Sequence, residues 1–221
     1  MCGRFNVIAT PGLKTLLGGL GVTATPRDRY NIAPTEAVPL LADGALREAR
    51  WWLTPSWAPR VAQRYAMFNA RSETLEESRA FRGPFRRQRG VVPMSSFLEW
   101  RRGAGGKTPW HISSTGRGLA AAALWDLWRG DDEILLSCAI VTTAAAPAFR
   151  PWHDRMPVLL TVEECRRWLA SGERIAADDP MLAPVLKFPL ELAPLAKAVG
   201  DARNKNPELM RPLAAAETIT P

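Results

Sequence analysis

The sequence has few residues of the kinds that cross-link a small fold or hold a metal. Among its 221 residues are three cysteines and two histidines. The cysteines (Cys2, Cys138 and Cys165) are too few for a disulfide framework and lack the C-x-x-C spacing of a structural zinc site. We therefore expect no metal, no cofactor and a reducing compartment.

Long apolar runs are also missing. No run approaches the roughly 18–20 residues of a transmembrane helix, and residues 1–10 lack a basic stretch followed by an apolar block. We expect no membrane contact, no secretory signal and a cytoplasmic location. A composition of 47% hydrophobic and 23% charged residues is that of a folded protein.

Charge and tryptophan are plentiful. Twenty-nine basic against 22 acidic residues give a net charge of +7. This surplus fits a polyanionic partner, above all nucleic acid, but also fits ordinary solubility. Nine tryptophans serve cores and base-stacking platforms equally well.

Nineteen prolines and sixteen glycines divide the chain into short segments. Alternating or continuous apolar patterns predict seven strands: Ala37–Leu41, Val91–Met94, Phe97–Trp100, Trp110–Ile112, Leu119–Leu124, Ile134–Thr143 and Met156–Thr161. Helices are predicted over Leu13–Leu17, over Glu73–Phe81, and after a capping box that Thr161 forms with Glu164. Strands outnumber helices, which favours an α+β fold: a single domain around a bent antiparallel β-sheet or open barrel with a few peripheral helices. We expect the domain over 1–206 and a loosely held tail over 207–221.

Cys2 is chemically unusual if Met1 is removed, as a small second residue normally permits. Its α-amine, with a pKa of about 7.7–8.0, can then condense with an aldehyde to an imine. The thiol can close on the imine carbon to give a five-membered thiazolidine ring. The alternative is that Cys2 is an incidental second residue.

Four further residues are candidates for chemistry. Asn69 can hold a substrate oxygen; Arg71 can face the same side or be a surface charge beside a helix cap. Glu99 lies among apolar neighbours, where burial suits a carboxyl to acid–base work, or it pairs with an arginine. His153, beside Asp154 and ahead of a proline, is the better candidate for a proton shuttle.

The other histidine and cysteines are expected to be structural. His111 falls within a predicted strand and suits a core or edge position. Cys138 and Cys165 fall in a buried strand and on an apolar helix face, where they would be inert.

Six short segments recur in one known family: Met1–Phe5, Arg29–Pro34, Asn69–Glu73, Phe97–Trp100, Ile140–Ala145 and His153–Pro157. In this order and spacing they resemble the SOS response-associated peptidase (SRAP) family, whose members act as abasic site processing proteins. Residues around Val199-Gly200 and from Asn204 to Pro212 also fit. Two positions depart from the family pattern, Trp52 and Ser96, where glycine is more common.

The resemblance implies an abasic-site sensor acting on single-stranded DNA. Cys2 would form a thiazolidine crosslink with the ring-opened aldehyde, with Asn69, Glu99 and His153 as the other active-site residues. Weak lyase activity and self-processing peptidase activity are also implied.

The same resemblance implies the DNA contacts. Arginines in the matched motifs would bind phosphates, two tryptophans would stack on bases, and two small residues would line the channel: Arg4, Arg71, Arg155, Trp51, Trp100, Pro34 and Thr142. We expect a monomer that is associated with the nucleoid in a prokaryote. The alternatives are a thiol peptidase acting on proteins, with an N-terminal nucleophile, and a noncovalent single-stranded DNA binder.

Overall fold

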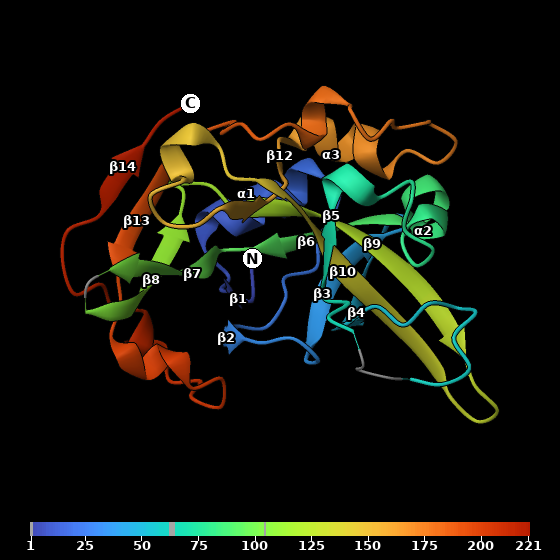
Figure 1. Cartoon of the computed structure of the whole chain (residues 1–221), viewed down its shortest axis with the longest axis horizontal. Coiled ribbons are helices and arrows are strands. Elements are labelled where there is room, and N and C mark those ends of the chain that lie inside the picture. The colour runs from blue at the N-terminus through green and yellow to red at the C-terminus, as the bar shows by residue number, and fades with distance from the viewer. Residues whose placement is uncertain (1, 62–64, 104) are drawn as a thin grey trace.

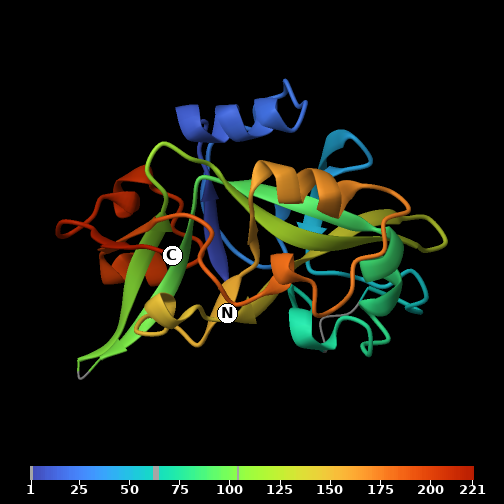
Figure 2. The ribbon, with the colours of Figure 1, turned by 90° about the horizontal axis from the view of Figure 1, so that it is seen from above.

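The computed structural model describes residues 2–61, 65–103 and 105–221. Two β-sheets pack face to face, and the helices lie at the periphery, as the two views together show (Figure 1 and Figure 2). Most pairings are antiparallel, while β10 also pairs in parallel with β4 and β5. This is the α+β architecture that the sequence predicts. Among the described residues, no helix is both long and apolar enough to cross a membrane.

The smaller sheet has six strands in the order β14-β13-β8-β7-β1-β2. Their bounds are β1 Arg4–Val7, β2 Arg29–Ile32, β7 Ser96–Gly103, β8 Gly106–Ser113, β13 Leu190–Pro194 and β14 Glu217–Ile219. β1 lies between β7 and β2, so the start of the chain is held inside a sheet. In Figure 1 β1 lies near the middle of the view, between β7 and β2.

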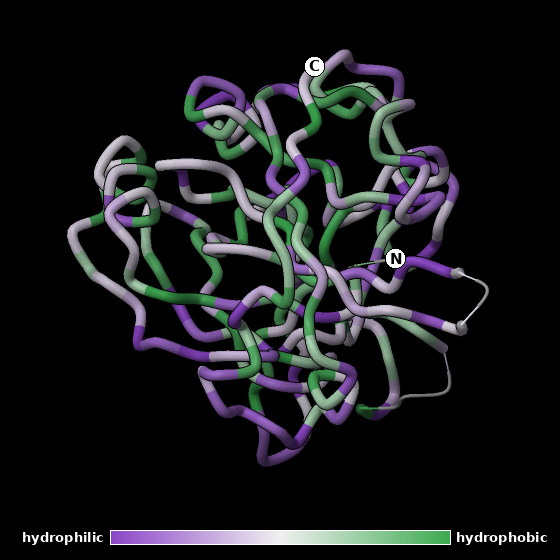
Figure 3. Tube along the Cα trace, turned by 90° about the vertical axis from the view of Figure 1, so that its left-hand side faces the viewer, coloured by the Kyte–Doolittle hydropathy of each residue, from purple (hydrophilic) through white to green (hydrophobic). Residues whose placement is uncertain are grey.

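The larger sheet has eight strands, with the path β11-β10-β4-β3-β6-β9-β12 and with β5 paired to β10. Their bounds are β3 Ala37–Ala42, β4 Ala45–Trp51, β5 Asn69–Arg71, β6 Arg89–Met94, β9 Leu119–Arg129, β10 Ile134–Ala144, β11 Arg155–Pro157 and β12 Leu159–Leu160. The predicted strand Met156–Thr161 is thus two short strands, separated at Val158. Apolar residues of both sheets form one main core, and hydrophilic residues gather in the outer loops (Figure 3).

Local sequence signals determine where two of the three α-helices of the described residues begin. α1 (Pro11–Gly19) begins after Thr10, whose side chain accepts a hydrogen bond from Leu13 N. α3 (Val162–Leu169) begins with the predicted capping box, in which Thr161 and Glu164 bond reciprocally.

The prediction of a helix over Glu73–Phe81 is wrong. Only a 3₁₀ turn, η1 (Ser72–Thr74), forms there, and α2 lies further on at Arg82–Arg87. α2 runs through Pro84 because a proline in the first turn removes an N–H that has no intrahelical partner. The other 3₁₀ turns are η2 Pro147–Phe149, η3 Pro180–Leu182, η4 Lys197–Gly200 and η5 Pro207–Met210.

The buried guanidinium of Arg89 joins α2 to α3. It donates to two carbonyls near the end of α2 (Phe85, Arg86) and to three at and beyond the end of α3 (Trp168, Ala170, Glu173), at 2.6–3.3 Å. The last carbonyls of a helix have no hydrogen-bond partner within the helix, so Arg89 supplies the missing donors at the ends of both α2 and α3.

The last residues are not simply a loose tail. Residues 217–219 pair with β13 in antiparallel register, from Leu190↔Ile219 to Leu192↔Glu217. Upstream, the side-chain amide of Asn31 on β2 donates to three carbonyls of the C-terminal segment (Val199, Asp201 and Asn204), each at 3.0 Å. Val199, Leu209 and Met210 of this segment also pack with Leu98 and Trp100 of β7, so the C-terminal chain covers that face of the smaller sheet.

Candidate active site

Cys2 lies just before β1 and is completely buried. Because β1 pairs with β7 through Phe5↔Phe97, Cys2 approaches the part of β7 that carries Glu99. Burial, and then the nearby Glu99 carboxylate, raise the pKa of the Cys2 thiol. The thiol is therefore protonated in the resting protein. Met1 lies outside the described residues.

Glu99 faces the space between the two sheets. It lies two residues beyond Phe97 on β7, so both side chains project from the core-facing side of the strand. Its side chain is only 3% exposed, and burial raises its pKa. A carboxyl in this setting holds its proton closer to neutral pH, as a general acid requires.

His153 lies between η2 and β11, with its Nε2 atom 3.9 Å from Oε2 of Glu99. The backbone N–H of Arg155 donates to its Nδ1 at 2.9 Å, which places the proton of the neutral ring on Nε2. Burial lowers the pKa of His153. A neutral imidazole thus presents an N–H toward the buried carboxyl.

Aromatic packing positions the turn that carries His153. Phe149 lies against Phe97 of β7, with ring centroids 6.0 Å apart, and Trp152 lies against Trp110 of β8 at 5.8 Å. The guanidinium of Arg101 covers the Trp152 ring at 5.3 Å. The turn is therefore anchored to the sheet that carries Glu99.

Asn69 reaches the site from the larger sheet. It begins β5, where it pairs with Ile140 of β10. Its Nδ2 donates to the carbonyl oxygen of Cys2 at 2.8 Å. Its Oδ1 is buried and has no hydrogen-bond partner among the described residues. Asn69 thus fixes the backbone of Cys2 and has an acceptor left for an incoming group.

The four predicted catalytic residues are therefore brought together between the sheets. Cys2 and Glu99 come from the smaller sheet, Asn69 from the larger one, and His153 from the turn before β11. The arrangement holds the backbone of Cys2 next to a carboxyl whose pKa is raised and an imidazole whose pKa is lowered.

Arg4 is engaged within the protein. Its guanidinium donates to Asn31 Oδ1 at 2.8 Å and to the carbonyls of Val199 and Gly200 at 3.3 and 3.1 Å. It also lies 5.7 Å from the centre of the Trp100 ring. Arg4 thus connects β1 to the C-terminal segment and supports Trp100, while its phosphate contact stays a prediction.

Arg155 and Arg71 differ in their surroundings. Arg155 forms two hydrogen bonds to Glu73, at 2.5 and 3.0 Å, and one to the Thr142 carbonyl. Burial acts to raise the pKa of Glu73, but the hydrogen bonds and charge of Arg155 together with hydrogen bonds from backbone N–H groups outweigh burial, so the pKa of Glu73 is lowered. Arg71, on β5, is exposed. Of the two arginines, Arg71 is the more accessible to a phosphate.

Two of the predicted DNA-contact residues, Trp51 and Thr142, are buried in this structure. Trp51 is completely buried and donates from Nε1 to the Phe68 carbonyl, so its ring supports the Asn69 segment and is not available to stack on a base. Thr142 is also completely buried, and its hydroxyl accepts a hydrogen bond from Arg155 at 3.2 Å, so its place in a channel stays a prediction. Trp100 and Pro34 are partly exposed, as their predicted roles require.

The two departures from the family pattern are accommodated locally. Trp52 is half-buried and lies against Phe68, with ring centroids 5.5 Å apart. The Ser96 hydroxyl accepts a hydrogen bond from the Asn6 side chain at 2.9 Å. Neither side chain belongs to the cluster of catalytic candidates.

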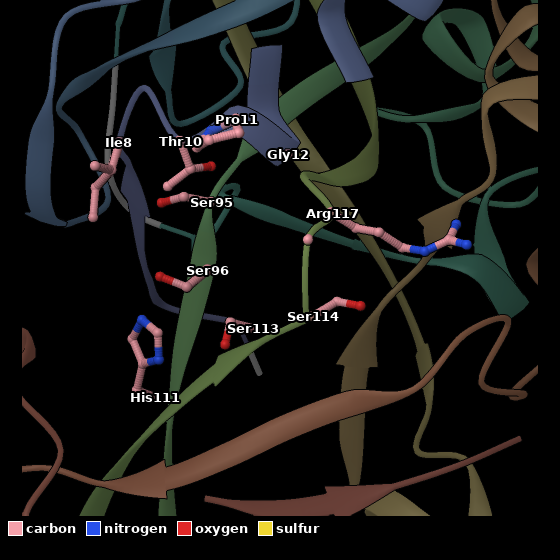
Figure 4. A pocket seen from close by; sticks show the side chains of 11 residues that line it. Ile8, Thr10, Pro11, Gly12, Ser95, Ser96, His111, Ser113, Ser114 and Arg117 are labelled. Carbon is pink, nitrogen blue, oxygen red and sulfur yellow. The ribbon is translucent and has the colours of Figure 1, made fainter. Parts of the chain in front are cut away.

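The remaining titratable candidates lie elsewhere. Burial raises the pKa of the Cys138 and Cys165 thiols, the latter to about 12, as suits inert cysteines. His111 lines a cavity of about 340 Å³ beside the start of α1, and the lining of this cavity is rich in hydroxyl groups (Figure 4). Burial lowers the pKa of His111 to about 4. The described residues contain no cluster of His, Cys, Asp and Glu suited to a metal ion.

Fold and site together define a two-sheet α+β protein in which a cysteine next to the N-terminus is buried beside a carboxyl, an amide and an imidazole. The family model described as "SOS response associated peptidase (SRAP)" matches residues 1–202. The chain belongs to this family.

Relatives from two different organisms share most of the chain. The abasic site processing protein YoqW of Bacillus subtilis (strain 168) is 34% identical over 193 residues, which cover 82% of this chain and 84% of that protein. The abasic site processing protein YedK of Escherichia coli (strain K12) is 31% identical, covering 96% and 100%. A crystal structure of a Bacteroides thetaiotaomicron protein has the same fold, with a TM-score of 0.81 at 21% identity and coverage of 96% and 100%.

Sequence reasoning missed the residues that position the site. Glu73 lies within a recognised motif, but its pairing with Arg155 joins segments 82 positions apart. Phe149 and Trp152 are aromatic residues close to His153, and that proximity in the sequence was the available signal.

Proposed function

We propose that this protein processes abasic sites in single-stranded DNA by forming a covalent link through Cys2. The observation that carries the proposal is the hydrogen bond from Asn69 Nδ2 to the Cys2 carbonyl, which holds the cysteine backbone beside Glu99. The names of the relatives, abasic site processing proteins, support the choice of substrate.

The reaction begins once Met1 has been removed. The Cys2 amine attacks the aldehyde carbon of the ring-opened sugar to give a carbinolamine, which takes a proton and loses water to form an iminium ion. The thiol sulfur then bonds to that carbon, the C=N electron pair returns to nitrogen, and the thiol proton leaves. The product is a thiazolidine, and one water molecule is released overall.

Each of the other residues has a role that fits its position. Glu99 protonates the departing hydroxyl, because burial raises its pKa. His153, with its N–H facing the same region, assists opening of the deoxyribose ring and, in reverse, release of the crosslink. Asn69 orients Cys2 by donating a hydrogen bond to the backbone carbonyl of Cys2.

Binding rests on charge and stacking. Arg71 and Arg155, with Arg4 behind Trp100, attract the phosphates, while Trp100 and Pro34 contact the nucleotides next to the lesion. Such contacts carry no base code, so we expect sequence-independent binding in the nucleoid. All catalytic candidates come from one chain, so a monomer suffices.

Two side activities follow from the same groups. The iminium intermediate permits weak β-elimination, which would appear as lyase activity. Cys2 can also take part in removal of Met1, which would be a self-processing peptidase activity without turnover of other proteins.

The test mixes purified protein with a single-stranded oligonucleotide carrying one abasic site and resolves the products on a denaturing gel. We expect a shifted band that requires both the abasic site and Cys2, and that disappears in Cys2→Ala. Intact mass of the free protein must show loss of Met1. A shifted band that persists in Cys2→Ala would refute crosslinking through Cys2.

Peptide substrates separate the alternatives. A labelled peptide added in trans is expected to stay intact, and its turnover would favour a general thiol peptidase. If Met1-free protein binds DNA but forms no covalent band, the noncovalent binder is the better description.

A further inference from the structure

Trp51 contacts both of the segments that carry Cys2 and Asn69. The hydrogen bond from Asn69 Nδ2 to the Cys2 carbonyl, at 2.8 Å, joins β5 of the larger sheet to the chain just before β1 of the smaller one. The geometry of this bond therefore depends on how β1 and β5 are placed relative to each other. Trp51 is the last residue of β4 and is completely buried.

On the Cys2 side, the contact is aromatic. Phe5 lies on β1, three residues after Cys2, and its ring meets the Trp51 ring edge to face, with centroids 4.9 Å apart and planes at 64°. Both side chains are completely buried. An aromatic pair has a preferred angle as well as a preferred distance, so it restricts the path of β1 more than aliphatic packing would.

On the Asn69 side, the contact is a hydrogen bond. Trp51 Nε1 donates to the Phe68 carbonyl at 2.8 Å, and the backbone N–H of Ile140 donates to the same oxygen at 3.0 Å. This carbonyl belongs to the planar peptide unit that links Phe68 to Asn69. Two donors on one carbonyl fix the orientation of that plane, and with it the direction in which the Asn69 side chain leaves the backbone.

Trp51 is itself held by the larger sheet. Its backbone N–H donates to the Glu36 carbonyl, and its carbonyl accepts from the N–H of Thr35, each at 2.9 Å. β4 and β5 both pair in parallel with β10, along the edge opposite β9 (Figure 1). The indole is therefore presented from a fixed backbone, as a group that positions others must be.

We propose that Trp51 is a positioning residue for the crosslinking reaction, whose ring and indole N–H set the place of the Cys2 backbone relative to Asn69. This inference rests on the proposed function, because crosslinking is the reaction that it affects. Trp51 acts through Phe5 and the Phe68 carbonyl and, being completely buried, does not touch the DNA. A displacement of about 1 Å in such a support can slow a reaction by about 100-fold while the reacting groups stay unchanged.

The test compares two tryptophan-to-phenylalanine substitutions that remove the same kind of group. Trp51→Phe keeps an aromatic ring and removes the N–H that reaches the Phe68 carbonyl. Trp168→Phe is the matched control, because Trp168 on α3 is also completely buried and donates from Nε1 to the Gly90 carbonyl at 2.9 Å. Both substitutions should lower the melting temperature by a similar amount.

Single-turnover crosslinking is measured on Met1-free protein with saturating abasic oligonucleotide, at a temperature where each variant is folded. Trp51→Phe should slow crosslinking by about 2- to 13-fold, the range that corresponds to one hydrogen bond. Trp168→Phe should leave the rate unchanged. Noncovalent affinity, measured by fluorescence anisotropy in a Cys2→Ala background, should be the same for both, because neither indole touches the DNA.

Phe5→Leu tests the other contact of Trp51 and takes its place if Trp51→Phe does not fold. It keeps an apolar side chain in the core and removes the edge-to-face pair, whose contribution is similar to that of one hydrogen bond. Crosslinking should therefore slow by a similar factor. Phe85→Leu is the control, because it removes the contact of a buried ring with Trp168 and should not slow the reaction.

A spectroscopic readout reports the position of Asn69 without any reaction. In a nitrogen-15 NMR spectrum, the side-chain amide signals of Asn69 should shift in Trp51→Phe, because the peptide unit before Asn69 loses one of its two donors. The same signals should stay in place in Trp168→Phe.

The outcomes distinguish this inference from the proposed function. If Trp51→Phe crosslinks at the normal rate, loses rate and affinity together, or is no slower than Trp168→Phe, the positioning role is refuted even though the unmodified protein crosslinks. If the unmodified protein forms no crosslink, the proposed function fails, and the Asn69 signals then decide whether Trp51 positions that side chain.

Discussion

Replacing Glu99 with glutamine keeps the size of the side chain and removes the proton that the carboxyl can give and take. General acid–base groups typically contribute 10²–10⁴ in rate. The Glu99 side chain is only 3% exposed, so water has little access to replace the carboxyl. We therefore expect the crosslinking rate of Glu99→Gln to fall toward the upper end of that range, by about 10³–10⁴.

Stability should change in the opposite direction. Burial raises the pKa of Glu99 above its ordinary value of 4.5, so the folded state binds the proton more tightly than the unfolded chain does. The resulting stabilisation is complete below the ordinary pKa and is lost as the pH rises through the raised pKa. Glutamine does not ionise, so Glu99→Gln should unfold at a higher temperature than the unmodified protein at neutral pH and at a similar one in acid.

The assay combines single-turnover crosslinking over a pH series with thermal unfolding of the same samples. Glu133→Gln, on an exposed carboxylate, is the matched control and should change neither quantity. If Glu99→Gln crosslinks at the normal rate, Glu99 is not the proton donor. A loss of stability at neutral pH would instead mean that the ionised carboxylate has a structural partner that glutamine cannot replace.

Three further substitutions address positioning, folding and DNA binding. Asn69→Ala leaves the buried Cys2 carbonyl without its donor, at a cost of about 1–3 kcal/mol, so single-turnover crosslinking should slow by about 5- to 160-fold; an unchanged rate would remove Asn69 from the mechanism. Arg89→Leu should lower the free energy of unfolding by about 3 kcal/mol in a urea titration, since carbonyls at two helix ends lose their donor. A loss under 1 kcal/mol would contradict this reading. Arg71→Ala should reduce the slope of log affinity against log salt by about 0.7, and an unaltered slope would exclude a phosphate contact.

Local signals predicted those parts of the fold that depend on neighbouring residues. The capping box at Thr161 and the apolar run Ile134–Thr143 each act within a few positions, and both elements are present. The parallel pairing of β10 with β4 and β5 depends on residues far apart in the chain, and no local pattern reports it. The prediction of a helix over Glu73–Phe81 was wrong for a related reason. Leu75 and Phe81 are apolar because tertiary packing buries them, although the segment between them is largely non-helical.

The candidate site was predictable as a set of residues and not as an arrangement. The ordered motifs identified Cys2, Asn69, Glu99 and His153, but their proximity depends on two sheets meeting. Burial was the least predictable property, as Trp51 illustrates. A tryptophan suits a core as well as a base-stacking platform, and only the packing of Trp51 against Phe5, at 4.9 Å between ring centroids, decides between them.

The burial of Cys2 orders the two bond-forming steps of the proposed reaction. Because the pKa of its thiol is raised, sulfur is protonated at neutral pH and is a poor first nucleophile. The freed α-amine, with a pKa of about 7.7–8.0, is partly neutral under the same conditions and attacks first. The iminium ion that follows places a positive charge next to the sulfur, which favours loss of the thiol proton. Glu99, having given its proton to the departing water, is then a carboxylate beside that thiol and can accept it, so one residue returns to its starting state within a single crosslinking event.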